Sequence, residues 1–224
     1  MNIIMDKINI FWGQKGSSSL FIKDKNLSLE QLRSACDKSI KLAYQIHSNI
    51  GYSIKDDFES FSKEGDFLIT NQKRLKIGVQ TADCVPIIFY DPCGVVGIAH
   101  AGWKGTLNNV AIKTATLMEE EFDCKKENIL IWIGPSAKGC CYEVNGRFID
   151  KLRPDLERNT VTRSGNKIYF DLPRYNQLLL VESGIKKENI NSMYNRCTIC
   201  NTDFGSYRRE GENSALQISY VMLS

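Results

Sequence analysis

Two neighbouring apolar segments joined by a turn constrain the fold of this chain more than any other feature. Residues 85–90 (VPIIFY) and 95–100 (VVGIAH) are almost continuously apolar, and residues 91–94 (DPCG) between them are a strong turn signal. Together the three segments predict a β-hairpin. Strands without polar alternation are covered on both faces, so we expect layers of protein on either side of this hairpin.

The rest of the chain mixes strand and helix signals without a regular βαβ order. Apolar patterns predict strands at residues 8–12, 67–70, 76–80, 128–133, 168–172 and 216–222. Helices are predicted at residues 28–41, from residue 105 onward, and between Pro173 and Gly184. Residues 41–47 fit either the end of a helix or a short strand. This mixture favours an α+β fold, with mixed β-sheets and flanking helices, over a doubly wound α/β fold.

Length, composition and charge favour one ordinary globular domain. The 224 residues are 42% hydrophobic and 25% charged and contain no repeats or Pro-rich linker, so we expect a single domain over residues 1–224. The net charge of +3 is scattered among acids, whereas nucleic-acid binding needs a concentrated basic face. No apolar run reaches the roughly 18–20 residues of a membrane span, and the N-terminus does not resemble a signal peptide. We therefore expect a cytoplasmic protein without nucleic-acid or membrane partners.

The eight cysteines are expected to be free thiols, since a chain of this length and apolar content does not need disulfide bonds. Residues 197–200 (CTIC) have the spacing of a redox or zinc-knuckle motif, but no second CxxC and no nearby histidine completes it. Cys140 and Cys141 are adjacent and could not readily form a disulfide bond with each other. For both pairs the sequence favours a structural role over metal binding or redox chemistry.

The chain has only two histidines, and each lies in an unusual local sequence. His47 lies within residues 44–48 (YQIHS), and His100 ends the second apolar segment and precedes residues 101–105 (AGWKG). Cys84 lies between them in the sequence, at the entry to the first apolar segment. Two imidazoles and one thiolate are ligands that zinc prefers, and three protein ligands leave a coordination position open. If these three side chains converge, they form the active site of a metalloenzyme.

Five short motifs, in the same order along the chain, identify a family. They are residues 45–47 (QIH), 81–86 (TADCVP), 100–105 (HAGWKG), 134–136 (GPS) and 206–209 (SYRR). Together they closely resemble the bacterial YfiH-like family, once called multicopper polyphenol oxidoreductases (laccases). The family is also described as purine nucleoside phosphorylase/adenosine deaminase enzymes and as peptidoglycan-editing factors. The resemblance runs from about residue 8 to the last residue, and it implies a zinc site at His47, Cys84 and His100, mixed β-sheets with outer helices, and a monomer.

Two positions depart from the family pattern. The family's N-terminal Thr-Arg-x-Gly-Gly loop reads GQKGS at residues 13–17, and whether Lys15 replaces the arginine is open. Near residue 204 a common Phe-Phe pair is replaced by Phe204-Gly205. Both departures concern the orientation of a substrate rather than the metal ligands.

The number of histidines decides between two of the activities described for the family. A multicopper oxidase needs a type-1 copper and a trinuclear cluster, which together take on the order of ten histidines. This chain has two, so a complete laccase centre is excluded. Copper-dependent polyphenol oxidation remains an alternative only with a single ion at the same three ligands. The favoured function is a zinc-dependent reaction of a purine nucleoside: phosphorolysis of adenosine, inosine or methylthioadenosine, and deamination of adenosine.

These two reactions need further groups around the metal. Deamination needs a carboxylate that moves protons. The candidates are Asp83, Asp171 and Glu143, of which Asp171 is favoured because it ends a predicted strand. Phosphorolysis needs cations that hold phosphate. The candidates are Lys104, Lys138, Arg208 and Arg209.

Two alternatives use the same cysteine or a larger ligand set. In the first, Cys84 is the nucleophile of a hydrolase or amidase, such as an enzyme that edits peptidoglycan precursors, with His47 or His100 as its base. A bound metal would quench that nucleophile, so this hypothesis and the zinc enzyme exclude each other. In the second, the chain is a non-enzymatic module with a structural zinc ion, which requires a fourth ligand such as Cys140 or Cys141.

Overall fold

The predicted hairpin forms the centre of a six-stranded mixed sheet. In the computed structural model, which describes residues 2–5, 7–14, 21–22, 39–55 and 63–224, β8 (Val85–Asp91) pairs antiparallel with β9 (Val95–Ala101). All residues of both strands are buried. The strand order is β14-β10-β8-β9-β6-β5, with parallel pairing only at its two ends. The other strands of this sheet are β5 (Gly51–Ser53), β6 (Phe67–Thr70), β10 (Leu130–Ile133) and β14 (Ile190–Asn191).

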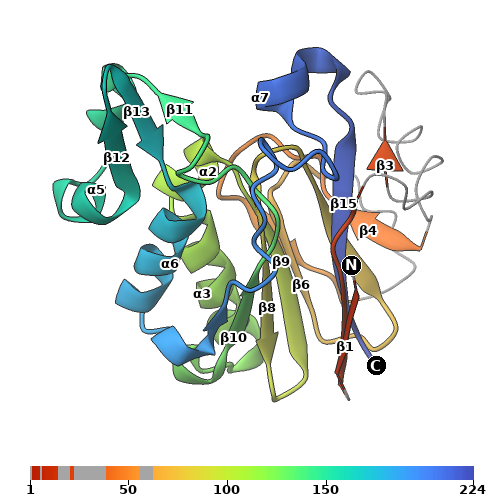
Figure 1. The fold of residues 1–224 in the computed structure, drawn as a ribbon. Coiled ribbons are helices and arrows are strands. Elements are labelled where there is room, and N and C mark those ends of the chain that lie inside the picture. The colour runs from red at the N-terminus through yellow and green to blue at the C-terminus, as the bar shows by residue number, and fades with distance from the viewer. Residues whose placement is uncertain (1, 6, 15–20, 23–38, 56–62) are drawn as a thin grey trace.

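A second six-stranded sheet packs against one face of the first (Figure 1). Its strand β15 (Leu216–Leu223) pairs antiparallel with β2, β3 and β7, and β4 is added parallel to β7. The other strands are β1 (Asn2–Met5), β2 (Ile8–Phe11), β3 (Phe21–Ile22), β4 (Ile40–Leu42) and β7 (Lys76–Thr81). A separate small sheet contains β11 (Glu143–Val144), β12 (Val161–Ser164) and β13 (Lys167–Phe170).

Two long helices cover the other face of the first sheet, as Figure 1 shows. Helix α3 (Val110–Phe122) contacts β9 and β6, and α6 (Leu172–Glu182) contacts α3. The shorter helices are α2 (Trp103–Leu107), α4 (Gly146–Ile149), α5 (Pro154–Thr160) and α7 (Tyr207–Glu210). Single 3-10 turns are η2 (Lys126–Asn128), η3 (Lys187–Asn189) and η4 (Gly211–Asn213).

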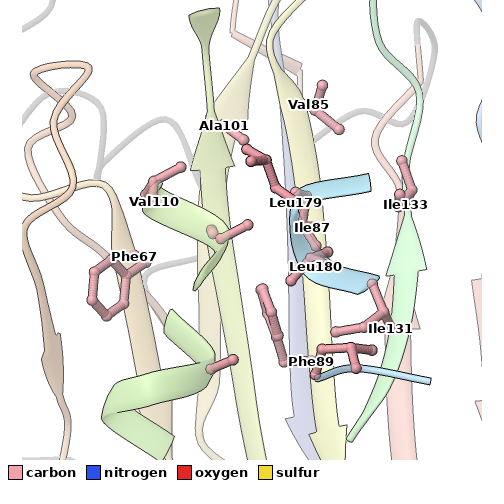
Figure 2. Packing of buried hydrophobic residues seen from close by; sticks show 14 of the residues in the cluster. Phe67, Val85, Ile87, Phe89, Ala101, Val110, Ile131, Ile133, Leu179 and Leu180 are labelled. Atoms are coloured by element: carbon pink, nitrogen blue, oxygen red, sulfur yellow. The ribbon is translucent and has the colours of Figure 1, made fainter. Parts of the chain in front are cut away.

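Alternating side chains of the hairpin fill the spaces on both sides of the first sheet. Ile87 and Phe89 lie on the helix side, in one buried cluster with Leu179 and Leu180 of α6 (Figure 2). Ile88 lies on the opposite face, in a second cluster with residues of β2 and β7. This burial on both faces explains why the sequences of the two hairpin strands are almost continuously apolar.

The predicted α+β fold is confirmed, and most strands lie where the sequence predicts them. The strand predicted at residues 168–172 is too long, because it ends at Phe170 and Asp171 then caps α6. The helix predicted from residue 105 onward is two helices, α2 and α3. Asn109 separates them, since its φ of 62° lies in the left-handed region.

The helix predicted at residues 28–41 lies mostly outside the described residues. Its end is wrong, because Ile40–Leu42 forms β4 and takes its extended conformation from parallel pairing with β7. Much of the loop at residues 13–17 also lies outside the described part of the chain. In that part, no helix combines the length and the apolar character needed to cross a membrane. The single domain, the cytoplasmic location and the monomeric state stay predictions.

We expect Ile98→Ala to lower the free energy of unfolding by about 2–5 kcal/mol, because it leaves a cavity between the two large sheets. Urea unfolding followed by tryptophan fluorescence measures this loss. Met193→Ala is the control, since that side chain is 69% exposed. The control should change the free energy of unfolding by less than about 0.5 kcal/mol. Equal losses in the two variants would contradict the position assigned to Ile98.

Candidate metal centre

The three predicted ligands meet where the hairpin strands end. His100 is the second-last residue of β9, Cys84 immediately precedes β8, and His47 lies in the loop between β4 and β5. Their ligand atoms all lie within 4.8 Å of one another, and Cys84 Sγ is 3.9 Å from His47 Nε2. The hairpin register, in which Pro86 is opposite His100, places Cys84 beside this histidine. The fold therefore brings together residues that are far apart in the sequence.

A buried carboxylate, Asp66, joins two of these ligands. It precedes β6, the neighbour of β9, and its Oδ1 atom is 2.8 Å from His100 Nδ1. The same carboxylate accepts hydrogen bonds from the backbone N–H groups of His47 (3.0 Å) and Ser48, and from Ser48 Oγ (2.6 Å). Because Asp66 holds Nδ1, the other ring nitrogen of His100 is the one available to a metal.

Asp66 is ionised in this setting. Burial raises the pKa of Asp66, but hydrogen bonds from His100 and Ser48 lower it by more, so it lies below its ordinary value. The sequence reasoning missed this residue because no motif contains it. The one signal was a single acid directly before the apolar strand β6, since a charged residue at such a position must be paired.

His47 has a backbone conformation that residues other than glycine rarely adopt. Its φ of 60° lies in the left-handed region, which costs about 1–3 kcal/mol for such a residue. The hydrogen bonds from this loop to the charged Asp66 offset that cost. The loop is therefore fixed in the one conformation that brings His47 to Cys84.

Asp83, the residue before Cys84, is also left-handed, with a φ of 83°. Its buried carboxylate accepts hydrogen bonds from Thr198 Oγ1 (2.6 Å), Ser206 Oγ (3.0 Å) and the backbone N–H of Arg208 (2.7 Å). Both oxygens are thus occupied. Asp83 therefore positions Cys84, and its carboxylate is not available to move a proton.

Gly102 lets the start of α2 approach the ligands closely. A Cβ atom at this position would lie 2.9 Å from His47 Cδ2 and 3.0 Å from Cys84 Sγ. Any larger residue would therefore displace one of the two ligands. The first glycine of the HAGWKG motif is explained by this lack of space.

The histidines stabilise the thiolate form of Cys84. Desolvation raises the pKa of this thiol, but attraction to His100 and hydrogen bonds with both histidines lower it to about 6. Desolvation lowers the pKa of His100, but Cys84 and Asp66 raise it by more, to about 9. In the metal-free protein these two groups therefore form an ion pair at neutral pH.

The three ligands line a cavity of about 550 Å³, within the range of roughly 300–1,000 Å³ that is typical of small-molecule sites. Aromatic side chains form part of its wall, from Trp103, Tyr142 and Tyr207. Arg208 also lines it, and its guanidinium lies 4.6 Å from the centre of the Tyr142 ring. The remaining lining residues are Gln45, Gln80, Ala82, Asp83, Leu172 and Leu216.

Two of the candidate carboxylates are not part of this cavity lining. Asp171 is the N-cap of α6 and accepts a hydrogen bond from the Arg174 N–H (3.0 Å). Glu143 forms an ion pair with Lys167 (3.1 Å). The structure brings neither carboxylate to the three ligands, and the acid that ends the predicted strand caps a helix instead.

Of the four candidate cations, Arg208 alone lines the cavity. The guanidinium of Arg209 donates hydrogen bonds to backbone carbonyl groups of residues 198–204 and so closes the loop before α7. Lys104 lies over the indole of its neighbour, 5.7 Å from the ring centre. Lys138 Nζ donates to a backbone carbonyl at 3.3 Å. Of these four residues, Arg208 is therefore the one placed to hold a phosphate beside the ligands.

The donor set fits one transition-metal ion. Two imidazole nitrogens and a thiolate are ligands that zinc prefers, and copper also binds them. Asp66 holds His100 in the way that outer carboxylates hold metal-bound histidines. Because the three ligands line a cavity, a fourth coordination position is open toward a substrate or water.

Comparison with known proteins gives one family. The family model described as multi-copper polyphenol oxidoreductase laccase matches residues 8–224. A purine nucleoside phosphorylase of Aquifex aeolicus (strain VF5) is 41% identical over 167 residues, which are 75% of each chain. Human purine nucleoside phosphorylase LACC1 is 32% identical over 231 residues, but this chain spans only 52% of that relative's length and 98% of its own. The crystal structure of the Bacillus licheniformis hypothetical protein YfiH matches with a TM-score of 0.84 and 25% identity, over 97% of this chain and 93% of that one.

We expect Cys84 of the metal-free protein to react with iodoacetamide with a pH midpoint near 6. The reactive thiolate predominates above that pH, rather than above about 8.5 as for an ordinary thiol. Peptide mass spectrometry after brief alkylation at a series of pH values measures each cysteine separately. Cys93 is the control, because desolvation and Asp91 raise the pKa of its thiol. A common midpoint for the two cysteines would contradict the ion pair with His100.

Proposed function

This chain belongs to the multi-copper polyphenol oxidoreductase laccase family, and on that premise we propose that it is a zinc-dependent purine nucleoside phosphorylase. The relatives from Aquifex aeolicus and human both carry the name purine nucleoside phosphorylase. The proposed substrates are adenosine, inosine or methylthioadenosine together with phosphate. Deamination of adenosine is proposed as a second reaction of the same cavity.

The observation that carries the proposal is that His47, Cys84 and His100 line the same cavity as Arg208. A metal-ligand set and a cation that face one space suit a reaction in which phosphate attacks a bound substrate. The cavity of about 550 Å³ has the size of sites that bind drug-sized molecules. It can therefore admit a nucleoside.

Phosphorolysis exchanges one bond for another at C1′ of the ribose. A phosphate oxygen forms a bond to C1′ while the bond between C1′ and the purine nitrogen breaks. The bonding electron pair leaves with the base, which takes up the proton that the phosphate loses, so the products are the free base and ribose 1-phosphate, or its 5-methylthio derivative when methylthioadenosine is the substrate. Zinc, when bound, would supply Lewis acidity at the open coordination position.

The side chains of the cavity would bind and orient the two substrates. The guanidinium of Arg208 rests on the Tyr142 ring and donates one hydrogen bond to the Glu143 carbonyl (2.7 Å), which fixes its plane. Its other N–H groups can bind two phosphate oxygens at once. Trp103 and Tyr207 offer aromatic surface to the purine.

The two proposed reactions differ in their need for a proton carrier. Deamination moves protons between water and the C6 amino group, which usually requires a side-chain carboxylate. Among the described residues that line the cavity, Asp83 is the only carboxylate, and both its oxygens already accept hydrogen bonds. In phosphorolysis the phosphate itself supplies the proton that the leaving base takes up, so this reaction does not need a carboxylate. We therefore expect phosphorolysis to be the faster reaction.

One observation favours a second candidate function. The ion pair of Cys84 and His100 in the metal-free protein is the arrangement that cysteine hydrolases use. With a metal bound, the thiolate is a ligand and no longer a nucleophile, so the two functions exclude each other. Copper at the same ligands, with weak polyphenol oxidation, is a further alternative that metal analysis distinguishes.

The test is incubation of untagged protein with adenosine, inosine or methylthioadenosine, with and without phosphate, followed by chromatography. We expect free base to appear only with phosphate, and inosine to form from adenosine more slowly. Removal of the metal by a chelator should abolish base release, and added zinc should restore it. Activity that survives metal removal and is lost on alkylation of Cys84 would support the hydrolase. No base release by zinc-loaded protein would overturn the proposal.

We expect Arg208→Ala to raise the KM for phosphate about 10- to 100-fold, since hydrogen bonds to charged groups contribute about 1.5–3 kcal/mol. The KM for the nucleoside should change by less than about threefold, because only the phosphate loses a partner. Steady-state kinetics with each substrate varied in turn measures both constants. Arg163→Ala is the control, since this exposed arginine of β12 forms an ion pair with Glu157 of α5 (2.7 Å) and does not line the cavity. An equal rise in the control would contradict phosphate binding by Arg208.

A further inference from the structure

Four cysteines form a second group outside the cavity lining. Cys140 and Cys141 lie in the loop between β10 and β11, and Cys197 and Cys200 lie in the loop between β14 and α7. Their Sγ atoms all lie within 4.8 Å of one another. In the sequence the two pairs have no visible connection, and the CTIC motif has no evident partner. The fold supplies that partner from a distant segment.

We propose that these four cysteines bind one zinc ion in a closed structural site, separate from the metal centre at the cavity. Zinc bonded to four thiolates at about 2.3 Å in tetrahedral geometry holds the sulfur atoms about 3.8 Å apart. The upper limit of 4.8 Å between the sulfurs requires only small side-chain rotations to reach that spacing. An iron–sulfur cluster has several iron atoms between its thiolates and so needs a wider arrangement.

The chemistry of the four ligands also favours a metal ion. Four thiols this close cannot all lose their protons unless a cation balances the charges, because the thiolates would repel one another. Cys197 is buried, so a thiolate at this position needs a cation beside it. A ligand set made only of thiolates in tetrahedral array selects zinc over calcium or magnesium.

The two loops that carry these cysteines either line the cavity or contact a residue that does. They already pair through a parallel bridge between Ser136 and Cys197. Tyr142, which lines the cavity, directly follows the first cysteine pair, and Thr198 lies within the CTIC motif and hydrogen-bonds to the Asp83 carboxylate. A zinc ion here would tie these two segments together. With four protein ligands it has no position for a substrate, so its role is structural. The site does not depend on the proposed function.

Zinc content of four proteins tests the proposal. The untagged chain, purified under reducing conditions without chelators, should hold about two zinc ions, and Cys84→Ser should hold about one. The double variant Cys197→Ser/Cys200→Ser should also hold about one, because each site is built from separate ligands. Met193→Ala is the control, since this exposed side chain belongs to neither site, and it should hold as much zinc as the unmodified chain.

Cobalt gives a readout that depends neither on activity nor on the cavity. The Cys84→Ser protein, stripped of metal and titrated with Co²⁺, should show the intense sulfur-to-cobalt charge-transfer bands of a four-thiolate site. Adding Cys197→Ser/Cys200→Ser should remove these bands. If the multiple variant does not fold, the titration of Cys84→Ser alone still decides. Absence of the bands there, or disulfide bonds among the four cysteines after reducing purification, would overturn the proposal.

Discussion

Asp66 is a buried charge that holds the His47 loop and the end of β9 together. A charge removed from water is stable only when hydrogen bonds surround it. Here the donors are the backbone N–H groups of the loop, the Ser48 hydroxyl and the His100 imidazole. The hydrogen bonds that stabilise the Asp66 carboxylate are therefore the same ones that fix the positions of His47 and His100. The pairing of β6 with β9 in the first sheet places the carboxylate where it can reach both ligands.

A buried carboxylate also fixes the segment that carries Cys84. Asp83 has the left-handed backbone that His47 also has, and its carboxylate draws in donors from Thr198, Ser206 and Arg208. Each of these two ligand segments is thus held by a buried carboxylate rather than by regular secondary structure. Groups held in this way keep their positions before a metal or substrate arrives, which reduces the free energy spent on ordering them. The loop that contains Thr198 also carries two of the four cysteines, and the loop of the other two contacts Asp83 through the Ala137 N–H, so the proposed structural zinc would hold both loops beside Asp83.

Local patterns were sufficient to predict most elements, whereas contacts between distant segments were not predictable. The hairpin at residues 85–100 follows from two apolar runs and a turn, but Ile40–Leu42 is a strand only because β7 lies beside it. The rarity of histidine and a family motif were enough to propose the three ligands. Asp66 had no motif, and Asp171 had the position of a sheet-end acid but caps a helix. The CTIC motif at residues 197–200 gave no sign of its partner, because an adjacent cysteine pair is not a recognised half of a zinc site.

Strand β15 has a consequence for the order in which the molecule can assemble on the ribosome. It lies between β2 and β7, and residues 216–223 are synthesised long after both neighbours. Until then the second sheet cannot close, and the apolar face of the first sheet stays exposed in the nascent chain, where chaperones bind such surfaces. The hairpin, the His47 loop and Asp66 are complete much earlier. A metal ion can therefore meet its ligands before Arg208 and Leu216 exist to enclose a substrate.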